Sequence, residues 1–413
     1  MTIAAQTLTI DRRAAETVAG PAPGSVAALA PVIARIAAEA QAPERTEGDV
    51  QAAIEQLRAA GFGTFRLPRA EGGAGASVPD LVSVVIALAE ADSNVPHALR
   101  NHALFVEKAQ RAKANPKFAR WLDEVRAGRL FGLGASELGI PDIGAGGGTT
   151  IVAPSGPGFV LDGEKYYSTG NAFVDYIHVN ARTPDGAAIA AVVPRGRDGV
   201  QVRDDWDGIG QQLTASGTTT FTGVRLTADE VVFQASEEVP VPHDATLAQL
   251  YLTSIVTGIL KAVARDAAHL IGSRNRNFYH ATAARPADDP QLQEALGRIA
   301  SAAYVAEAAV LRAAETLDGA LESARAGHPD TALFEEAARR AAQSKVVLDG
   351  LALDAATRLF DVGGASAATR RARLDRHWRN IRTLASHNPV AYKARALGRQ
   401  ILDGTPLPTA AFF

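Results

Sequence analysis

The distribution of apolar positions separates a central β region from helical regions on either side of it. Short runs of β-branched, aromatic and other apolar residues are bounded by Gly, Pro, Asp or Asn at 176–179, 187–193 and 218–221. This pattern is typical of strands that end in turns. The segment Leu161–Lys165 contains Asp-Gly, a pair that tolerates positive φ, and we predict a hairpin turn there. These features place a β domain at residues 130–240.

Before and after this domain, apolar residues recur every three or four positions, as they do on one face of an amphipathic helix. In an N-terminal helical domain (25–129), we predict helices at 25–40, 50–60 and 79–108, the last broken near Asn94 and Pro96. In the C-terminal region (241–413), we predict helices at 245–274, 290–326 and 330–360 and a four-helix bundle. The predicted class is α+β, and residues 1–24, rich in small residues, Pro and Gly, are predicted to be a mobile tail.

Composition narrows the classes of function. The 413 residues carry a formal net charge of −3, which gives no general case for binding nucleic acid or an anionic membrane. The absence of cysteine excludes disulfides, thiolate metal sites and a cysteine nucleophile. No apolar run approaches the ~20 residues that span a bilayer, and no secretory signal is recognisable. We therefore expect a cytoplasmic protein without a metal site, in which the basic run at 370–382 serves subunit or anion contacts.

Several local motifs follow one another along the chain. They are the glycine-rich loop Leu67–Gly75, the pair Ser136-Glu137, the run Lys165–Gly170, the segment Asp204–Thr218, the pair Gly363-Gly364, the basic run Arg376–Arg382, and His387-Asn388-Pro389. Each is weak alone; the first loop, for example, lacks the Lys-Ser/Thr of a phosphate-binding loop. In this order they resemble the acyl-CoA dehydrogenase superfamily over nearly the whole chain. The resemblance implies that family's N-terminal helical domain, β domain and C-terminal four-helix bundle.

One position distinguishes the branches of this superfamily. The catalytic glutamate of many members falls on Asn388 here, and an amide cannot take a proton from a substrate carbon. Glu307 and Glu315 leave open a dehydrogenase whose base lies elsewhere in the bundle. The motifs around Trp206 and His387 instead resemble a branch of flavin-dependent monooxygenases that includes dibenzothiophene monooxygenase and enzymes of alkylsulfone and methanesulfinate metabolism. Leu133 departs from that branch, whose members usually carry Asn at this position.

The resemblance implies a two-component enzyme. A separate flavin reductase supplies reduced FMN, with FAD as the other candidate, and reduced flavin and O2 form a C4a-hydroperoxyflavin. That species oxygenates a small organosulfur or other heteroatom substrate. The resemblance also implies a homotetramer. Two alternatives are an FAD-dependent acyl-CoA dehydrogenase and an inactive scaffold of the same fold that serves as a binding module.

Two histidines receive catalytic roles from the resemblance. His387 matches the proton donor to flavin-bound oxygen, a role suited to imidazole because it exchanges protons near neutral pH. Its weaker alternative is a helix-terminal histidine bound to a carbonyl. His102 matches a second histidine that faces the flavin, and a purely structural role is about equally supported.

Six further positions are implied to contact the flavin. Ser136 lines it, Tyr167 stacks on the ring, Thr169 bonds near N5, Trp206 forms a wall of the pocket, Ser216 bonds the phosphate-bearing tail, and Arg276 reaches the flavin phosphate of a neighbouring subunit. The last role suits the fork of a guanidinium group. The alternatives are ordinary packing for the aromatic residues, a turn for Ser216 and a solvated helix end for Arg276.

Overall fold

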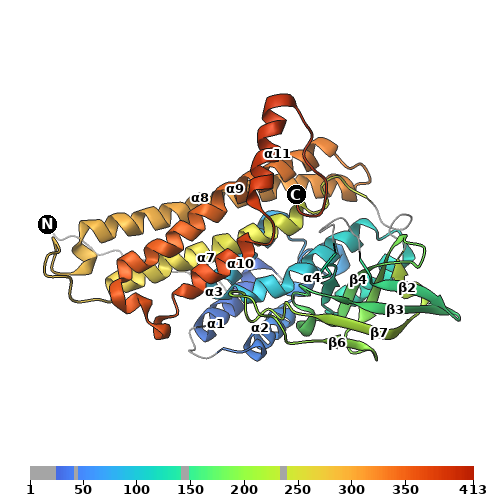
Figure 1. The fold of residues 1–413 in the computed structure, drawn as a ribbon. Coiled ribbons are helices and arrows are strands. Elements are labelled where there is room, and N and C mark those ends of the chain that lie inside the picture. Colours follow the sequence, from blue (N-terminus) through green and yellow to red (C-terminus); the bar gives the residue numbers. More distant parts are fainter. Residues whose placement is uncertain (1–24, 41–44, 141–147, 233–239) are drawn as a thin grey trace, which may run out of the picture.

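The computed structural model describes residues 25–40, 45–140, 148–232 and 240–413, so the predicted tail at 1–24 lies outside the described residues. Figure 1 shows N-terminal helices in blue, a twisted sheet in green, and long helices from yellow to red that extend away from the sheet. The predicted α+β architecture of helices, sheet and helical bundle is confirmed.

Among the described residues, the N-terminal part contains the α-helices α1 (Val26–Glu39), α2 (Glu47–Ala59), α3 (Val78–Asp92), α4 (Asn94–Arg111) and α5 (Pro116–Arg126). The sequence did not predict α5. The predicted break at Asn94 and Pro96 is the start of α4, because a proline in the first turn has no intrahelical hydrogen bond to lose. His97 and His102 therefore lie on this helix and not after it.

The β domain is one mixed sheet in the described part of the chain. Its strands are β1 (Phe131–Gly134), β2 (Ile151–Ser155), β3 (Gly158–Lys165), β4 (Tyr176–Arg182), β5 (Ala188–Pro194), β6 (Val200–Val202), β7 (Thr219–Leu226) and β8 (Val231–Val232). The order is β6-β7-β3-β2-β4-β5-β8, and β1 pairs with β4 in parallel. The three predicted strands correspond to β4, β5 and β7.

The predicted hairpin turn at Leu161–Lys165 is wrong. This segment continues strand β3, and the register with β7 shifts between Leu161 and Gly163, which marks a β-bulge. Glycine is required there because a Cβ at Gly163 would lie 2.5 Å from Oγ1 of Thr150. The hairpin turn lies earlier, at Gly156-Pro157, where Gly156 has a φ of 59°.

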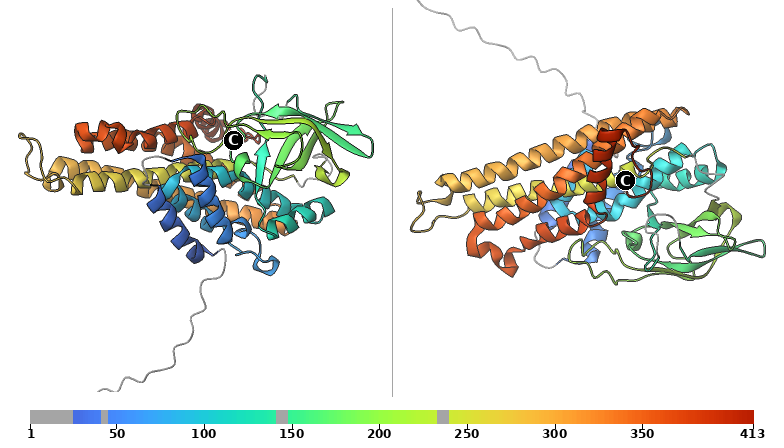
Figure 2. Two further views of the ribbon diagram at one scale, coloured as in Figure 1. Left: turned by 90° about the horizontal axis from the view of Figure 1, so that it is seen from below. Right: turned by 45° about the horizontal axis from the view of Figure 1, so that its top comes forward.

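The C-terminal part contains the long helices α7 (Thr246–Gly272), α8 (Pro290–Arg325) and α9 (Thr331–Gly363) and the shorter α10 (Asp375–Ala385) and α11 (Val390–Asp403). Helices α7 to α10 form the bundle, in which α10 packs against α7 and α9 (Figure 2). Helix α7 is long and apolar enough to cross a membrane, but 83% of its most apolar window is buried inside the protein, as expected for a central bundle helix.

The N-terminal helices and the bundle share one hydrophobic core. Helices α3 and α7 approach closely because Gly258 has no side chain; a Cβ there would lie 2.3 Å from the carbonyl oxygen of Ile86. Glu107 on α4 adds a buried ionic link, since its carboxylate binds Arg66 at 2.6 Å and Arg325 of α8 at 2.7 Å. These ion pairs hold α4 against the bundle.

Candidate active site

The candidate site lies where α4, the segment 206–216 and the turn between α10 and α11 meet. Figures 1 and 2 place the C-terminus at the same boundary between bundle and sheet. Nη1 of Arg100 on α4 lies 3.5 Å from Nε2 of His387, and the ring of His387 contacts Phe412 edge-on, with 5.5 Å between centroids. Residues about 290 positions apart in the sequence are thus neighbours here.

A chain of hydroxyl groups faces the β-domain side of this site. Oγ1 of Thr169 lies 2.8 Å from Oγ of Ser216, which lies 2.6 Å from Oγ1 of Thr214. All three residues are buried. The predicted flavin contacts Thr169 and Ser216 are therefore direct neighbours, and they form a patch of polar groups that can each donate or accept a hydrogen bond.

Two aromatic side chains flank the hydroxyl chain. Tyr167 is 56% exposed, and its ring packs edge-on against Trp206, with 6.0 Å between centroids. The indole nitrogen of Trp206 donates to the carbonyl oxygens of Gly210 at 3.3 Å and Gln211 at 3.0 Å. These bonds fix the indole ring and leave the phenol ring of Tyr167 as an accessible flat surface.

Backbone strain is concentrated around the same residues. Tyr167, Gln211 and Ala215 have φ values of 57°, 53° and 46°, in the left-handed region that side chains with a Cβ disfavour. Such conformations cost of order 1–3 kcal/mol each and persist where the surrounding structure enforces them, most often at functional sites. The strain indicates that the positions of Tyr167 and of segment 206–216 are selected for more than stability.

A buried hydrogen-bond network holds segment 206–216 against α4. Nδ1 of His97 lies 3.0 Å from Oε1 of Gln211, and Nε2 of Gln211 donates to Oγ of Ser93 at 2.8 Å. The backbone amide of Gln211 donates to Oδ1 of Asn380 on α10 at 2.8 Å. Burial and the charge of Arg100 lower the pKa of His97 to about 3, so this ring is neutral at physiological pH.

The basic run at 370–382 also supports this segment. Nη1 of Arg379 donates to the carbonyl oxygen of Ile209 at 2.9 Å, while Arg376 and His377 both bind Asp266 of α7, at 2.6 and 2.8 Å. These structural roles could not be predicted from local sequence patterns, because each partner lies more than 100 positions away.

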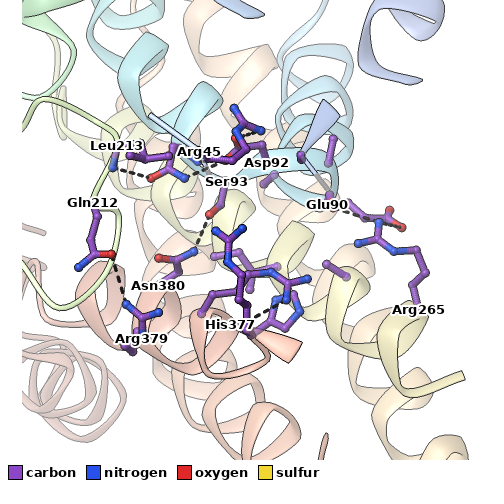
Figure 3. Close-up of a pocket in the computed structure, with 18 residues that line it drawn as sticks. Arg45, Glu90, Asp92, Ser93, Gln212, Leu213, Arg265, His377, Arg379 and Asn380 are labelled. Atoms are coloured by element: carbon purple, nitrogen blue, oxygen red, sulfur yellow. Dashed lines mark hydrogen bonds and ion pairs between the residues drawn. The ribbon is translucent and has the colours of Figure 1, made fainter. Parts of the chain in front are cut away.

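A cavity of about 110 Å³ lies beside these residues (Figure 3). Its lining includes several arginines, but carboxylates neutralise the labelled ones. Arg45 pairs with Asp92 at 2.8 Å, and Arg265 lies 3.6 Å from Glu90. Because the charges are compensated and the lining holds the segment 206–216 in place, we regard the cavity as part of the support for the site.

The structure gives His102 a structural environment. It is 2% exposed, its Nε2 lies 2.8 Å from the carbonyl oxygen of Gly63, and its Nδ1 accepts from the backbone amide of Phe131 at 3.2 Å. Nε2 must therefore carry the ring proton, and both nitrogens are engaged. Burial lowers the pKa of His102 to about 4. This geometry favours the alternative of a histidine that links α4 to β1 over the predicted catalytic role.

His387 has a different environment. A guanidinium group can only donate, so Nε2 of His387 accepts from Arg100 and the ring proton lies on Nδ1. The residue is exposed, while its ring packs against Phe412 and lies beside Arg100. Desolvation by the surrounding protein, followed by the charge of Arg100, holds the pKa of His387 well below its usual value. At neutral pH the side chain offers one N–H group, at Nδ1.

Asn388 occupies the position at which a dehydrogenase would need a base. Its Nδ2 donates to Oε1 of Gln249 at 2.6 Å and to the carbonyl oxygen of Phe412 at 3.2 Å. Of the two alternative carboxylates, Glu307 pairs with Lys261 of α7 at 2.9 Å. Lys261 lies roughly 15 Å along α7 from Tyr251, the α7 residue that interacts electrostatically with Arg100. Glu315 pairs with its helix neighbour Arg312 at the surface. Neither is a free carboxylate beside His387.

The remaining predicted contacts lie at two edges. The carbonyl oxygen of Ser136 accepts from the amide of Tyr166 at 2.9 Å, which places Ser136 beside Tyr167. Arg276 is exposed and makes no hydrogen bond or ion pair with the described residues. The nearby Arg274 instead binds the last carbonyl oxygens of α9, including that of Val362 at 2.6 Å. Of the two arginines, only Arg276 is therefore available to another molecule.

Comparison with known proteins agrees with this geometry. Residues 250–392 match the acyl-CoA dehydrogenase C-terminal domain. FMN-bound TdsC from Paenibacillus sp. A11-2 is 27% identical, with a TM-score of 0.83 over 94% of this chain and 99% of that one. The chain therefore has the fold of the acyl-CoA dehydrogenase superfamily. The methanesulfinate monooxygenase MsuC from Pseudomonas fluorescens is 26% identical, with the same TM-score of 0.83 and the same coverage, 94% and 99%.

Sequence relatives extend the comparison. The probable FMNH2-dependent monooxygenase SfnC of Pseudomonas putida is 28% identical over 88% of this chain and 91% of its own length. A dibenzothiophene monooxygenase of Mycolicibacterium goodii is 28% identical over 88% and 90%. The resemblance to the flavin-dependent monooxygenase branch is therefore confirmed.

The residues present fit a flavin. The accessible ring of Tyr167 beside Trp206 provides a flat apolar surface, and the hydroxyl groups of Thr169 and Ser216 lie next to it. Oγ of Ser168, between the aromatic and hydroxyl residues, is buried without a hydrogen-bond partner in the described part of the chain. An unpaired buried hydroxyl is expected where a ligand completes the site. No group of metal-binding side chains occurs among the described residues.

Proposed function

We propose that this protein is a monooxygenase that uses reduced FMN and O2 to oxygenate the sulfur atom of a small organosulfur compound. The observation that carries the proposal is a full-length similarity to FMN-dependent monooxygenases, combined with a site that offers histidine, arginine and amide groups where a dehydrogenase needs a carboxylate. Both alternatives are disfavoured. A dehydrogenase needs a catalytic base where this chain has Asn388. The strained backbone at Tyr167 and the unpaired buried hydroxyl of Ser168 argue against an inactive scaffold.

Reduced FMN, when bound, supplies two electrons that allow one atom of O2 to reach the substrate and the other to leave as water. The residues of the chain hold the reaction geometry. Tyr167 and Trp206 bind the ring, Thr169 and Ser216 bind its polar edge and tail, and Nδ1–H of His387 donates a proton to reacting oxygen. A flavin reductase is the transient partner, and FMN is favoured over FAD by the relatives.

We also infer a homotetramer, in which Arg276 of one copy binds the flavin phosphate of another. The exposed and unpaired guanidinium group supports this arrangement, as do exposed aromatic side chains beside it, such as Tyr279 at 99%. Light scattering at micromolar concentration tests the assembly, and a monomer would contradict it. The cytoplasmic location remains a proposal from the sequence.

The function is tested by supplying reduced FMN from NADH and a flavin reductase in air, with methanesulfinate or dibenzothiophene as substrate. With ¹⁸O₂, mass spectrometry should find one ¹⁸O atom in the product. Bleaching of stoichiometric, tightly bound FAD by an acyl-CoA would instead identify a dehydrogenase. Absence of both reactions, together with no flavin binding, would identify a scaffold.

A further inference from the structure

Arg100 is a cation without a counter-ion. Its guanidinium group makes no ion pair with a carboxylate of the described residues; Nη1 approaches Nε2 of His387 at 3.5 Å, and Nε is buried without a hydrogen-bond partner. Burial lowers the pKa of Arg100 to about 10, so it remains charged at neutral pH. The side chain as a whole is half-buried, and a partly desolvated charge without a counter-ion is costly.

A second unpaired donor lies close to Arg100. The hydroxyl of Tyr251 on α7 is buried without a hydrogen-bond partner among the described residues, and the side chain is 1% exposed. Burial raises the pKa of Tyr251, while the nearby charge of Arg100 lowers it in part, so the phenol is neutral and can donate. Two donors without an acceptor indicate that the missing partner carries acceptor oxygens.

The surrounding side chains add positive charge. Lys345 of α9 pairs with Asp349 at 2.8 Å, but Lys393 of α11 donates to a neutral group, the carbonyl oxygen of Phe412, at 2.8 Å. Both lysines are buried, and their charges contribute to the low pKa of His387. The side chains around His387 thus comprise three cations, Arg100 included, and one carboxylate. The excess positive charge favours an anionic ligand.

We propose that Arg100 binds the negatively charged oxygens of the substrate, and that the substrates of this site are small alkanesulfinates. The inference rests on the proposed function. Because Arg100 contacts His387, the residue assigned to the reacting oxygen, an anionic group bound to Arg100 lies close to the reacting sulfur. A sulfinate meets this condition, since its two oxygens match a guanidinium fork and its sulfur retains a lone pair.

The reaction balances with the components already named. The sulfur of R–SO2⁻ forms one new S–O bond and loses two electrons, giving R–SO3⁻. The O–O bond of O2 breaks, and the second oxygen atom leaves as water with two electrons and two protons from the reduced flavin. The charge of the substrate is the same before and after, so Arg100 keeps one counter-ion throughout.

Binding is measured first, by isothermal titration calorimetry of methanesulfinate into the flavin-free protein. Arg100→Met should weaken binding by about 10- to 100-fold, the range for a hydrogen bond to a charged group. Arg100→Lys should recover part of the loss, because the charge remains and the fork is removed. Arg298→Met removes an exposed cation far along α8 and should bind as wild type does. Circular dichroism checks folding, and Arg100→Gln serves as a second variant.

Turnover is measured second, with reduced FMN supplied as above. The kcat/KM for methanesulfinate should fall at least 10-fold in Arg100→Met and should stay at the wild-type value in Arg298→Met. Wild-type binding by Arg100→Met, or failure of the wild type to bind methanesulfinate, would overturn the proposal. Lost FMN affinity with unchanged sulfinate affinity would overturn it too, since the guanidinium would then serve the flavin. Arg100-dependent sulfinate binding without oxidation of either compound would support the anion site and contradict the monooxygenase function.

Discussion

Replacement of His387 by phenylalanine tests the proposed proton donor. Phenylalanine keeps the edge-on contact with Phe412, now 5.5 Å between centroids, but removes both ring nitrogens. The long bond from Arg100 to Nε2 and the N–H at Nδ1 are therefore lost together. General acid–base groups typically contribute ~10²–10⁴ in rate. Since each factor of ten corresponds to about 1.36 kcal/mol, product formation should lose roughly 3–5 kcal/mol of transition-state stabilisation.

The assay compares three rates in one experiment: NADH consumption by the reductase, sulfonate formation and hydrogen peroxide release. In His387→Phe, oxygen consumption should persist while hydrogen peroxide replaces the sulfonate. Flavin and sulfinate binding should be retained, which separates this outcome from that of Arg100 variants. Coupled product formation near the wild-type level in His387→Phe would refute the assignment. His102 could then act only if its bonds to Gly63 and Phe131 opened.

Three further outcomes follow from the structure. Arg276→Ala should weaken reduced-FMN binding by about 1.5–3 kcal/mol, and Arg276→Lys should recover only part of it, as measured by equilibrium titration; unchanged affinity in both would return Arg276 to a solvated surface role. Glu107→Ala should lower the free energy of unfolding by ~3–5 kcal/mol in urea, because two guanidinium groups lose their partner; a loss under 1 kcal/mol would contradict this. His97 and His102 have folded pKa values of about 3 and 4, below the usual ~6.5, so the unfolded chain binds protons first as the pH falls. Their contribution to stability is therefore present above pH 6.5 and lost toward pH 4, by about 2 kcal/mol each between pH 7 and 5. In urea unfolding measured across this range, His97→Gln should make the free energy of unfolding less dependent on pH.

The long bundle helices could be predicted from the sequence, and the β-bulge could not. Helices α7, α8 and α9 end within a few residues of their predicted limits, because apolar periodicity sustained over many turns leaves little ambiguity. A bulge and a hairpin turn both favour Asp-Gly, and they differ only in what pairs alongside. Strand β7 pairs with β3 through this point, a contact between segments that no local pattern contains.

Contacts between segments that are distant in the sequence also explain which site residues could be predicted and which were missed. Thr169 and Ser216 could each be assigned to the flavin site from motifs, but their contact with each other could not. The occupancy of both nitrogens of His102 likewise depends on groups 39 and 29 positions away. Arg100 was missed, although one signal was present. It lies three residues after His97 on a helix whose face is largely buried, where an arginine without a nearby acidic residue is unusual.

The charge on Arg100 couples substrate binding to the proton carried by His387. At neutral pH, where His97 is uncharged, the pKa of His387 is lowered by burial first, and then by the charges of Arg100 on α4, Lys345 on α9 and Lys393 on α11. A sulfinate bound to Arg100 would cancel the charge that has the largest effect, so the pKa of His387 should rise and the ring should become a better proton carrier only when substrate is present. NMR titration of histidine-labelled, flavin-free protein should show this rise on adding methanesulfinate, and Arg100→Met should abolish it. A His387 pKa that stays fixed while methanesulfinate binds would show that the two residues act independently.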